Sequence, residues 1–188
     1  MVPSRSPKPS VADRGQRLIA IARDAITQGP DLRADFAWGE EWLREIAASF
    51  VTLREAGELR GCIGSVDAYR ALGDDVAQNA RASAYRDPRF APVSAAEISR
   101  LDVEVSVLTP RVPLAAASED DALARLRPGE DGVYLEYQGV RATFLPQVWE
   151  SLPDPLDFLD ELRRKARLPA RFWHPELRLS RYGVEKYK

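Results

Sequence analysis

Apolar residues recur every three or four positions in four segments of the chain, which is the spacing that places them on one face of a helix. In the first segment, Leu18, Ala22 and Ile26 share such a face, and Gly29-Pro30 ends the pattern. Apolar residues show the same helical spacing in three later segments, and Pro169 follows the last of them. The spacing predicts helices over residues 11–28, 70–85, 118–126 and 153–168.

Strict alternation of apolar and polar residues predicts a strand between the second and third of these helices. Within residues 101–108, leucine and valine occupy the odd positions, while Asp102, Glu104 and Ser106 occupy the other face. In a half-buried strand, the apolar face packs on the core and the polar face is left for solvent or for a ligand.

Two further segments, residues 50–64 and 131–145, predict hairpins, with Gln138-Gly139 at the tip of the second. Over residues 176–187 the alternation slips by one position, which we attribute to a bulge near Gly183. Hairpins mixed with helices, without repeated βαβ units, indicate an α+β fold in which a mainly antiparallel sheet is flanked by helices.

Composition is that of a globular protein. The chain has 188 residues, of which 45% are hydrophobic and 30% charged, enough for one domain with a substantial core. Residues 1–13 lack the apolar core of a signal peptide and predict a disordered tail, which leaves residues 14–188 as a single domain. No apolar run approaches the roughly 20 residues that span a bilayer, so we expect a cytoplasmic protein.

Charge and ligand residues argue against several classes of function. The net charge is −2, which gives no overall field to attract nucleic acid. One cysteine and one histidine, His174, are too few soft ligands for a conventional zinc site. The chain also lacks the glycine-rich loops that bind nucleotides. A magnesium or iron site built from carboxylates stays open, but no spacing of acidic residues points to one, so we expect no metal site and no cofactor.

The cysteine lies between two glycines in the segment LRGCIGS, residues 59–65. Backbone N–H groups exposed by Gly61 and Gly64, together with the charge of Arg60, would bind an anion or favour a thiolate at Cys62. The alternative is structural, because glycines let two backbone segments approach closely and a buried cysteine packs as a small hydrophobic side chain. The residues alone leave both interpretations open.

The polar face of residues 101–108 offers a second group of candidates. Glu104 and Ser106 lie in the middle of the strand. One interpretation is a solvated face. The other is a cleft that these two residues line together with Arg60 and Cys62, and the alternation alone does not choose between them.

Two proline-containing segments add candidates of their own. The segment RDPRF, residues 86–90, carries Asp87 and Arg89, which either cap the preceding helix or clamp a carboxylate or phosphate. In ATFLPQVWE, Thr143 and Gln147 lie on either side of a proline and offer hydrogen-bond donors to a ligand.

Four segments occur in an order that resembles the AMMECR domain family: FVTLREAGELRGCIGS, DDVAQNARASAYRDPRFAPVSAAEI, LDVEVSVLTP and PGEDGVYLEYQGVRATFLPQVWESLPDPLDFLDELRRKA. The resemblance covers residues 14–187. It implies an α+β fold with a larger and a smaller subdomain that meet at a cleft, and it marks LRGCIG as the usual candidate for a functional site. One departure is Lys165-Ala166-Arg167, where the family has glycine in third place, so we expect a different turn there.

The resemblance implies partners rather than an activity. Bacterial and archaeal members are called protein A of the AmmeMemoRadiSam system, a name that joins them to a Memo-type protein, related to non-haem-iron dioxygenases, and to a radical S-adenosylmethionine (radical SAM) protein. We expect a component of a shared modification pathway that acts on a small molecule or a macromolecule; the alternative is a non-catalytic adaptor for those two proteins. Cys62 and Glu104 are the candidate catalytic residues. The candidate substrate-binding residues are Arg60, Gly61, Gly64, Ser65, Asp87, Arg89, Ser106, Thr143 and Gln147.

Overall fold

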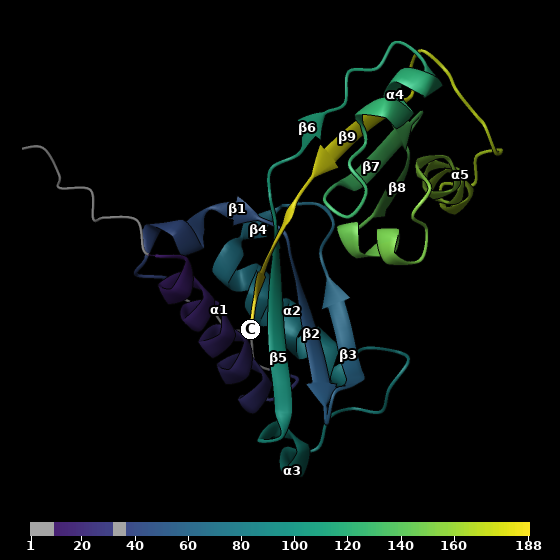
Figure 1. The fold of residues 1–188 in the computed structure, drawn as a ribbon. Helices are drawn as coiled ribbons and strands as arrows, with labels where there is room; N and C mark the ends of the chain where they lie inside the picture. The colour runs from purple at the N-terminus through teal and green to yellow at the C-terminus, as the bar shows by residue number, and fades with distance from the viewer. Residues whose placement is uncertain (1–9, 32–36) are drawn as a thin grey trace, which may run out of the picture. The chain divides into compact units, whose positions relative to one another are not determined.

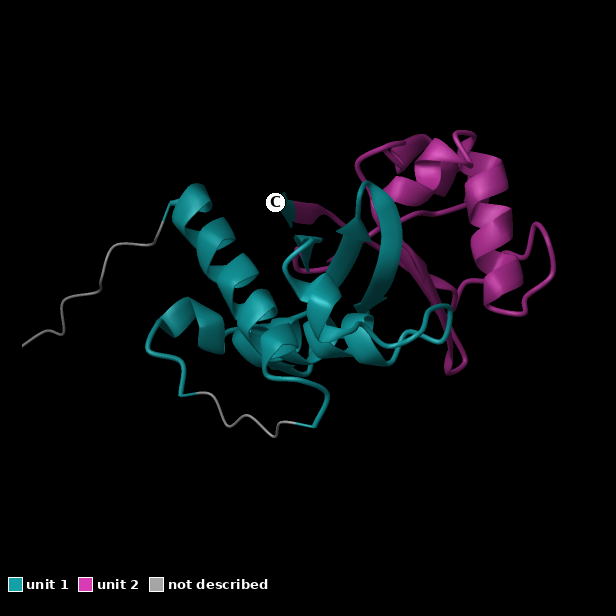
Figure 2. Ribbon diagram, turned by 90° about the horizontal axis from the view of Figure 1, so that it is seen from below, with its two compact units in different colours: residues 1–107, 186–188 teal, residues 108–185 magenta. Residues whose placement is uncertain are grey.

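The fold is taken from a computed structural model that describes residues 10–31 and 37–188 (Figure 1). It combines helices with antiparallel strands, which confirms the α+β class expected from the sequence. The chain divides into two compact units, the first formed by residues 1–107 with 186–188 and the second by residues 108–185 (Figure 2). Among the described helices, none has the length and apolar character needed to cross a membrane.

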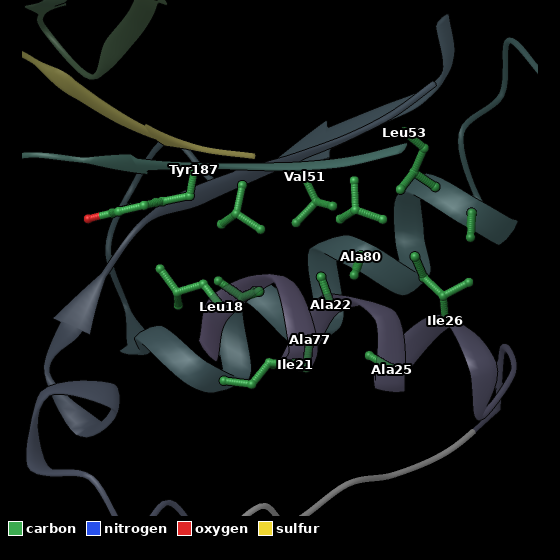
Figure 3. Close-up of a cluster of buried hydrophobic side chains, with 14 of the residues drawn as sticks. Leu18, Ile21, Ala22, Ala25, Ile26, Val51, Leu53, Ala77, Ala80 and Tyr187 are labelled. Atoms are coloured by element: carbon green, nitrogen blue, oxygen red, sulfur yellow. The ribbon is translucent and has the colours of Figure 1, made fainter. Parts of the chain in front are cut away.

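The first unit carries two long helices and most of a four-stranded sheet of order β10-β5-β2-β3. Helices α1 (Val11–Thr27) and α2 (Leu72–Tyr85) pack on one face of this sheet, where their apolar side chains meet those of the strands (Figure 3). The strands are β2 (Ser49–Glu55), β3 (Glu58–Gly64), β5 (Leu101–Leu108) and β10 (Val184–Tyr187). The shorter elements are η1 (Glu41–Arg44), β1 (Ile46–Ala47), β4 (Arg70–Ala71) and α3 (Ala95–Ile98).

Strand β2 lies between β3 and β5, and its register sorts the side chains onto two faces. Val51 lies opposite Ile63 on one side and Val105 on the other. Val51 and Val105 are fully buried in the core beneath the helices. Because side chains alternate along a strand, the residues on either side of Val51 point to the face that the helices do not cover.

The second unit has its own sheet, of order β6-β9-β7-β8, and its own core. At the centre of this core, Trp149 stacks on Phe158 with 3.7 Å between ring centroids, and its indole N–H donates to the Asp131 carbonyl. The strands are β6 (Val112–Pro113), β7 (Gly132–Tyr137), β8 (Val140–Phe144) and β9 (Arg178–Tyr182). The helical elements are α4 (Glu119–Arg125), η2 (Pro146–Glu150) and α5 (Pro155–Lys165).

The predicted helices and hairpins are present, but the boundary of the N-terminal tail was placed too late. Helix α1 begins at Val11, so residues 11–13 are helical rather than disordered. The reason is a capping box, in which the Ser10 hydroxyl accepts from the Asp13 N–H while the Asp13 carboxylate accepts from the Ser10 N–H. The remaining tail, residues 1–9, lies outside the described residues.

The predicted bulge at Gly183 is wrong. The chain leaves β9 at Tyr182 and enters β10 at Val184, and these two strands belong to different sheets. Between them, the Gly183 N–H donates to Thr109 Oγ1 at 2.7 Å, and the Gly183 carbonyl accepts from the Thr109 N–H at 3.0 Å. The alternation slips because the residues before and after Gly183 contribute to two different cores.

Helix α5 ends in the turn that usually requires a glycine after the C-cap residue, but here that position is occupied by Arg167. Arg167 has a φ of 60°, in the left-handed region. The Leu168 N–H donates to the Arg163 carbonyl and the Arg167 N–H donates to the Arg164 carbonyl, both at 2.9 Å, which is the Schellman pattern. The turn that we expected to differ is therefore retained, and the arginine bears the strain of a glycine conformation.

Candidate functional site

Three polar side chains lie in a line across the sheet face that points away from α1 and α2. The strand register places Cys62 of β3 opposite Thr52 of β2, and Thr52 opposite Glu104 of β5. Residues directly opposite each other in antiparallel strands share a face, with Cβ atoms about 5 Å apart. The Thr52 hydroxyl lies 3.4 Å from the Cys62 thiol. We call Cys62, Thr52 and Glu104 the thiol row.

The thiol row brings together two of the residues that the sequence singled out, Cys62 and Glu104. All three of its side chains are partly buried. Glu104 is paired with Lys188, whose Nζ lies 3.1 Å from Glu104 Oε2. Thr52, which joins the two candidates, was missed, because an alternating strand does not show which of its polar residues has a neighbour on the next strand.

A second line of residues runs beside the thiol row. Phe50 of β2 lies opposite both Gly64 of β3 and Ser106 of β5. A Cβ atom on Gly64 would lie 2.2 Å from Phe50 Cγ, so the glycine provides the space in which the aromatic ring sits. Ser106 is buried. Gly64 therefore serves to seat an aromatic ring next to the thiol row.

A stripe of polar residues along α2 holds β2 and β3 from the core side. Ser83 donates to the Val51 carbonyl at 2.7 Å and accepts from the Ile63 N–H at 2.8 Å. Two other polar residues on the same helix face bind the backbone at the start of β2. The Asp75 carboxylate accepts from the Ser49 N–H, and the Asn79 amide donates to the Ser49 carbonyl. The stripe consists of one residue in every four: Asp75, Asn79, Ser83 and, just beyond the helix, Asp87. The polar residue at every fourth position is the signal that the sequence carries for this stripe, and of the four only Asp87 was among the predicted site residues.

Gly61 allows β3 to approach α2 closely. A Cβ atom at Gly61 would lie 2.2 Å from the backbone carbonyl oxygen of Ser83. Backbone cannot yield as a flexible side chain does, so any other residue at this position must displace the strand or the helix. The contact supports the structural interpretation of this glycine.

Asp87 and Arg89 cover the outer edge of β3 at Cys62. Strand β3 ends its sheet, so its outer backbone groups have no neighbouring strand. The Cys62 N–H donates to Asp87 Oδ2 at 2.9 Å, and Arg89 Nη2 donates to the Cys62 carbonyl at 3.2 Å. Hydrogen bonds from the Arg89 side chain and from the Cys62 N–H hold the pKa of Asp87 well below its usual range. The pair replaces a missing strand and fixes the backbone of Cys62.

Arg60 pairs away from the thiol row. Its Nε donates to Glu97 Oε1 and its Nη1 donates to the Ala91 carbonyl, both at 2.9 Å. The Arg60 side chain, with further help from Ser94, lowers the pKa of Glu97 to about 2. These bonds tie the loop after α2 to β3, and they occupy the guanidinium for which an anionic ligand was predicted.

Ser65 belongs to a buried polar network just beyond β3. Its hydroxyl donates to Asp75 Oδ1 at 2.7 Å, and Arg70 Nε donates to the same oxygen at 2.7 Å. The other carboxylate oxygen accepts from Ser49 and from Asn79. A carboxylate can be fully buried here because both of its oxygens are saturated with donors. The network anchors the segment that follows LRGCIG to the start of α2.

The remaining two candidates belong to the second unit. Thr143 is buried, and its hydroxyl donates to the Val133 carbonyl at 2.8 Å and lies 2.7 Å from the Tyr182 hydroxyl. Burial raises the pKa of Tyr182. Gln147 is exposed on η2. Thr143 is thus used within its own sheet, while Gln147 presents its amide at the surface.

Within residues 10–31 and 37–188, no group of three or more histidine, cysteine, aspartate or glutamate side chains is placed to hold a metal ion. The thiol row itself contributes one thiol and one carboxylate, fewer than the three or four protein ligands usual for zinc.

The arrangement of these elements along the chain matches a known family. A family model described as AMMECR1 matches residues 19–187. The chain belongs to the AMMECR1 family. The matched range contains the thiol row, Phe50 with its neighbours, and the whole of the α2 stripe. The resemblance noted in the sequence is therefore confirmed for almost the entire chain.

Relatives of similar length support the AMMECR1 assignment. A protein from Methanothermobacter thermautotrophicus is 38% identical over 187 residues, which cover 94% of this chain and 95% of that protein. A protein from Thermotoga maritima is 32% identical over 174 residues, which cover 90% of this chain and 94% of that protein. The crystal structure of the uncharacterized protein PH0010 from Pyrococcus horikoshii has a TM-score of 0.78 at 31% identity, over 93% of this chain and 91% of that one. These names state no activity.

Proposed function

We propose that the thiol row is a substrate-binding site in which Cys62 and Glu104 are the reacting groups. One observation carries this proposal: the Cys62 side chain points away from the core, while its backbone is fixed through Asp87 and Arg89. A cysteine that merely filled space would point toward the core, as Val51 does on the neighbouring strand. Fixing the backbone of a residue whose side chain is left available is the arrangement expected of a functional group.

The three members of the row have separate roles in this proposal. Cys62 supplies the nucleophilic sulfur. The Thr52 hydroxyl, 3.4 Å away, donates to the thiolate when it forms, and such charge-assisted bonds are stronger than neutral ones. Glu104 exchanges a proton with the substrate as general acid or base. The substrate is then held by hydrogen bonds and by the Phe50 ring rather than by Arg60, which is paired with Glu97.

We further propose that the chain acts in the modification pathway after which the AmmeMemoRadiSam system is named. Its partners would be the Memo-type protein and the radical SAM protein, and its substrate a small molecule or a macromolecule other than nucleic acid. Membership of the AMMECR1 family supports this proposal. The net charge of −2 supports the exclusion of nucleic acid.

The reactivity of the thiol tests the proposal. Cys62 is the only cysteine, so the intact mass of the protein reports its alkylation directly. We expect iodoacetamide to label the folded protein at pH 7, and Thr52→Val to slow labelling about threefold through loss of the charge-assisted bond. Thr27→Val is the control, because the Thr27 hydroxyl donates to the Arg23 carbonyl of its own helix. Labelling that requires denaturant, or equal rates in both variants, would overturn the proposal.

A second candidate function, the non-catalytic adaptor, is favoured by a different observation. Arg60, Gly61 and Gly64 all make contacts inside the first unit, so much of LRGCIG serves the architecture of β3. An adaptor would keep partner binding and product formation when Cys62→Ser is mixed with the Memo-type and radical SAM proteins. An enzyme would keep partner binding and lose the product.

A further inference from the structure

We propose that the second unit carries an oxyanion-binding site, in which the Arg111 guanidinium and the hydroxyls of Tyr134 and Ser180 hold a carboxylate or phosphate group. This site belongs to a different unit from the thiol row, and it does not depend on the function proposed for Cys62. Three observations carry the inference: two neighbouring hydroxyls without partners, an arginine that lies over one of them, and the positive charge of the sheet face around them.

Tyr134 and Ser180 lie on the face of the second sheet that does not form its core. Val133 and Leu135, the neighbours of Tyr134 on β7, are fully buried in the core to which α5 contributes. Because side chains alternate along a strand, Tyr134 points to the opposite face. The register places Ser180 of β9 directly opposite Tyr134, so the two side chains share that face.

The hydroxyl groups of these two residues lack hydrogen-bond partners. Only 6% of Tyr134 is exposed, yet its hydroxyl makes no hydrogen bond within the part of the chain that the structure describes, and the same holds for Ser180. A tyrosine as buried as this usually has a partner for its hydroxyl. Thr143, on the other side of Tyr134, shows that usual outcome, because its hydroxyl lies 2.7 Å from that of Tyr182. Two adjacent hydroxyls without partners point to a ligand that accepts hydrogen bonds from them.

Arg111 brings a positive charge to these hydroxyls. It immediately precedes β6, the strand that pairs with β9 at Ser180. Its Cζ lies 3.5 Å from the centroid of the Tyr134 ring. At this distance the guanidinium stacks on the ring through its flat face, and its N–H donors lie in its own plane. One oxyanion can therefore accept from the guanidinium and from the phenol at the edge of the same ring.

The rest of this sheet face is also positive. In the next row of the same face, Arg178, Glu136 and Arg141 stand side by side across β9, β7 and β8. Together with Arg111, this row gives three arginines and one glutamate, and the single glutamate can balance only one of the three. An anion is therefore a better match for this face than a cation. Carboxylates and phosphates are the anions whose oxygens fit the paired donors of a guanidinium.

The test is a titration followed by amide chemical shifts, with acetate and inorganic phosphate as separate probes. Chloride at the same ionic strength is the reference for a general effect of salt. We expect an oxyanion, and not chloride, to cause saturable shifts at the amides of Arg111, Tyr134 and Ser180. Binding of either probe supports the site, and the relative affinities show whether carboxylate or phosphate is the better match.

Substitutions assign the binding to these side chains. Tyr134→Phe removes one hydroxyl and keeps the ring beneath Arg111, so we expect about fivefold weaker binding. Arg111→Gln removes the charge and should weaken binding at least about tenfold. Tyr137→Phe is the matched control. Tyr137 lies on the same strand, but its ring packs against Phe172 and His174, so this variant should bind as the wild type does.

The same spectra show whether each variant is folded, so unfolding cannot be mistaken for a loss of binding. Three results would each overturn the proposal: shifts of equal size with chloride, no saturable shift with either oxyanion, or equal binding by Tyr134→Phe and the wild type.

Discussion

The two faces of the first sheet are made by the same strands, yet adjacent residues of β3 meet very different surroundings. Gly61 lies so close to α2 that an added Cβ atom would lie 2.2 Å from a backbone oxygen. Cys62, the next residue, points the other way, and its thiol has the Thr52 hydroxyl as its hydrogen-bonding neighbour. The contrast shows that β3 is closely packed on its core-facing side, whereas its other side carries the thiol row, for which we propose a chemical role.

The largest effect should come from the face that packs on α2. Gly61→Ala places a methyl group against the Ser83 carbonyl, which neither the strand nor the helix can easily accommodate. We expect the free energy of unfolding, measured in urea, to fall by about 3 kcal/mol. Gly39→Ala is the control, since a Cβ atom there meets nothing within 4 Å. Equal stabilities for these two variants would contradict the close approach of β3 to α2.

A smaller, pH-dependent effect should follow from breaking the edge of β3. Asp87→Asn weakens the bonds from Cys62 and Arg89, and we expect a loss of about 2 kcal/mol at pH 7. The pKa of Asp87 in the folded protein lies well below the 3.8 of a free side chain. The stabilisation that the Asp87 carboxylate gives is therefore fully present above pH 3.8, the pKa of the free side chain. It is lost as the pH falls toward the lower pKa of the folded protein.

The measurement is the difference in unfolding free energy between the wild type and Asp87→Asn at a series of pH values. The difference should be constant between pH 5 and 7 and should shrink as the pH is lowered toward 3. Gly39→Ala, which changes no charge, supplies the control, and its difference from the wild type should not vary with pH. A difference for Asp87→Asn that grows on acidification would show that the charged carboxylate does not stabilise the fold.

The smallest effect should come from the opposite face. Cys62→Ser replaces a half-buried thiol whose side chain makes one hydrogen bond, and we expect the unfolding free energy to change by no more than about 0.5 kcal/mol. Chemical denaturation of this variant alongside Gly61→Ala measures the contrast between the two faces of β3. A loss from Cys62→Ser as large as that from Gly61→Ala would mean that both faces are structural.

Local patterns were enough to predict the elements of the fold, and not enough to predict what the side chains contact. Alternation over Leu101–Leu108 predicted β5 correctly because the period of a strand is a property of consecutive residues. The bulge predicted at Gly183 was wrong because the alternation slips where the chain passes from one sheet to another. A short stretch of sequence does not show such a change of sheet. Arg60 was assigned to a ligand because the sequence does not reveal that Glu97 lies beside it.

The candidate site shows the same limit. Cys62 and Glu104 were singled out separately, from a cysteine between glycines and from a polar strand face. Their relation through Thr52 depends on the register of three strands, which the sequence does not specify. The stripe from Asp75 to Asp87 could have been recognised from its spacing of four, but only its pairing with β2 and β3 gives that spacing a meaning.

The dependence of the Cys62 alkylation rate on urea is the sharpest test of the proposal that the thiol is reactive in the folded protein. If the thiol is available in the native protein, its labelling rate will stay constant as urea is raised through the range in which the protein remains folded. If the thiol is reached only when the protein unfolds, the rate will rise exponentially with urea from the lowest concentrations, in parallel with the unfolded fraction. We expect the constant rate. A rate that follows unfolding would make LRGCIG a packed bend and would remove Cys62 from the site.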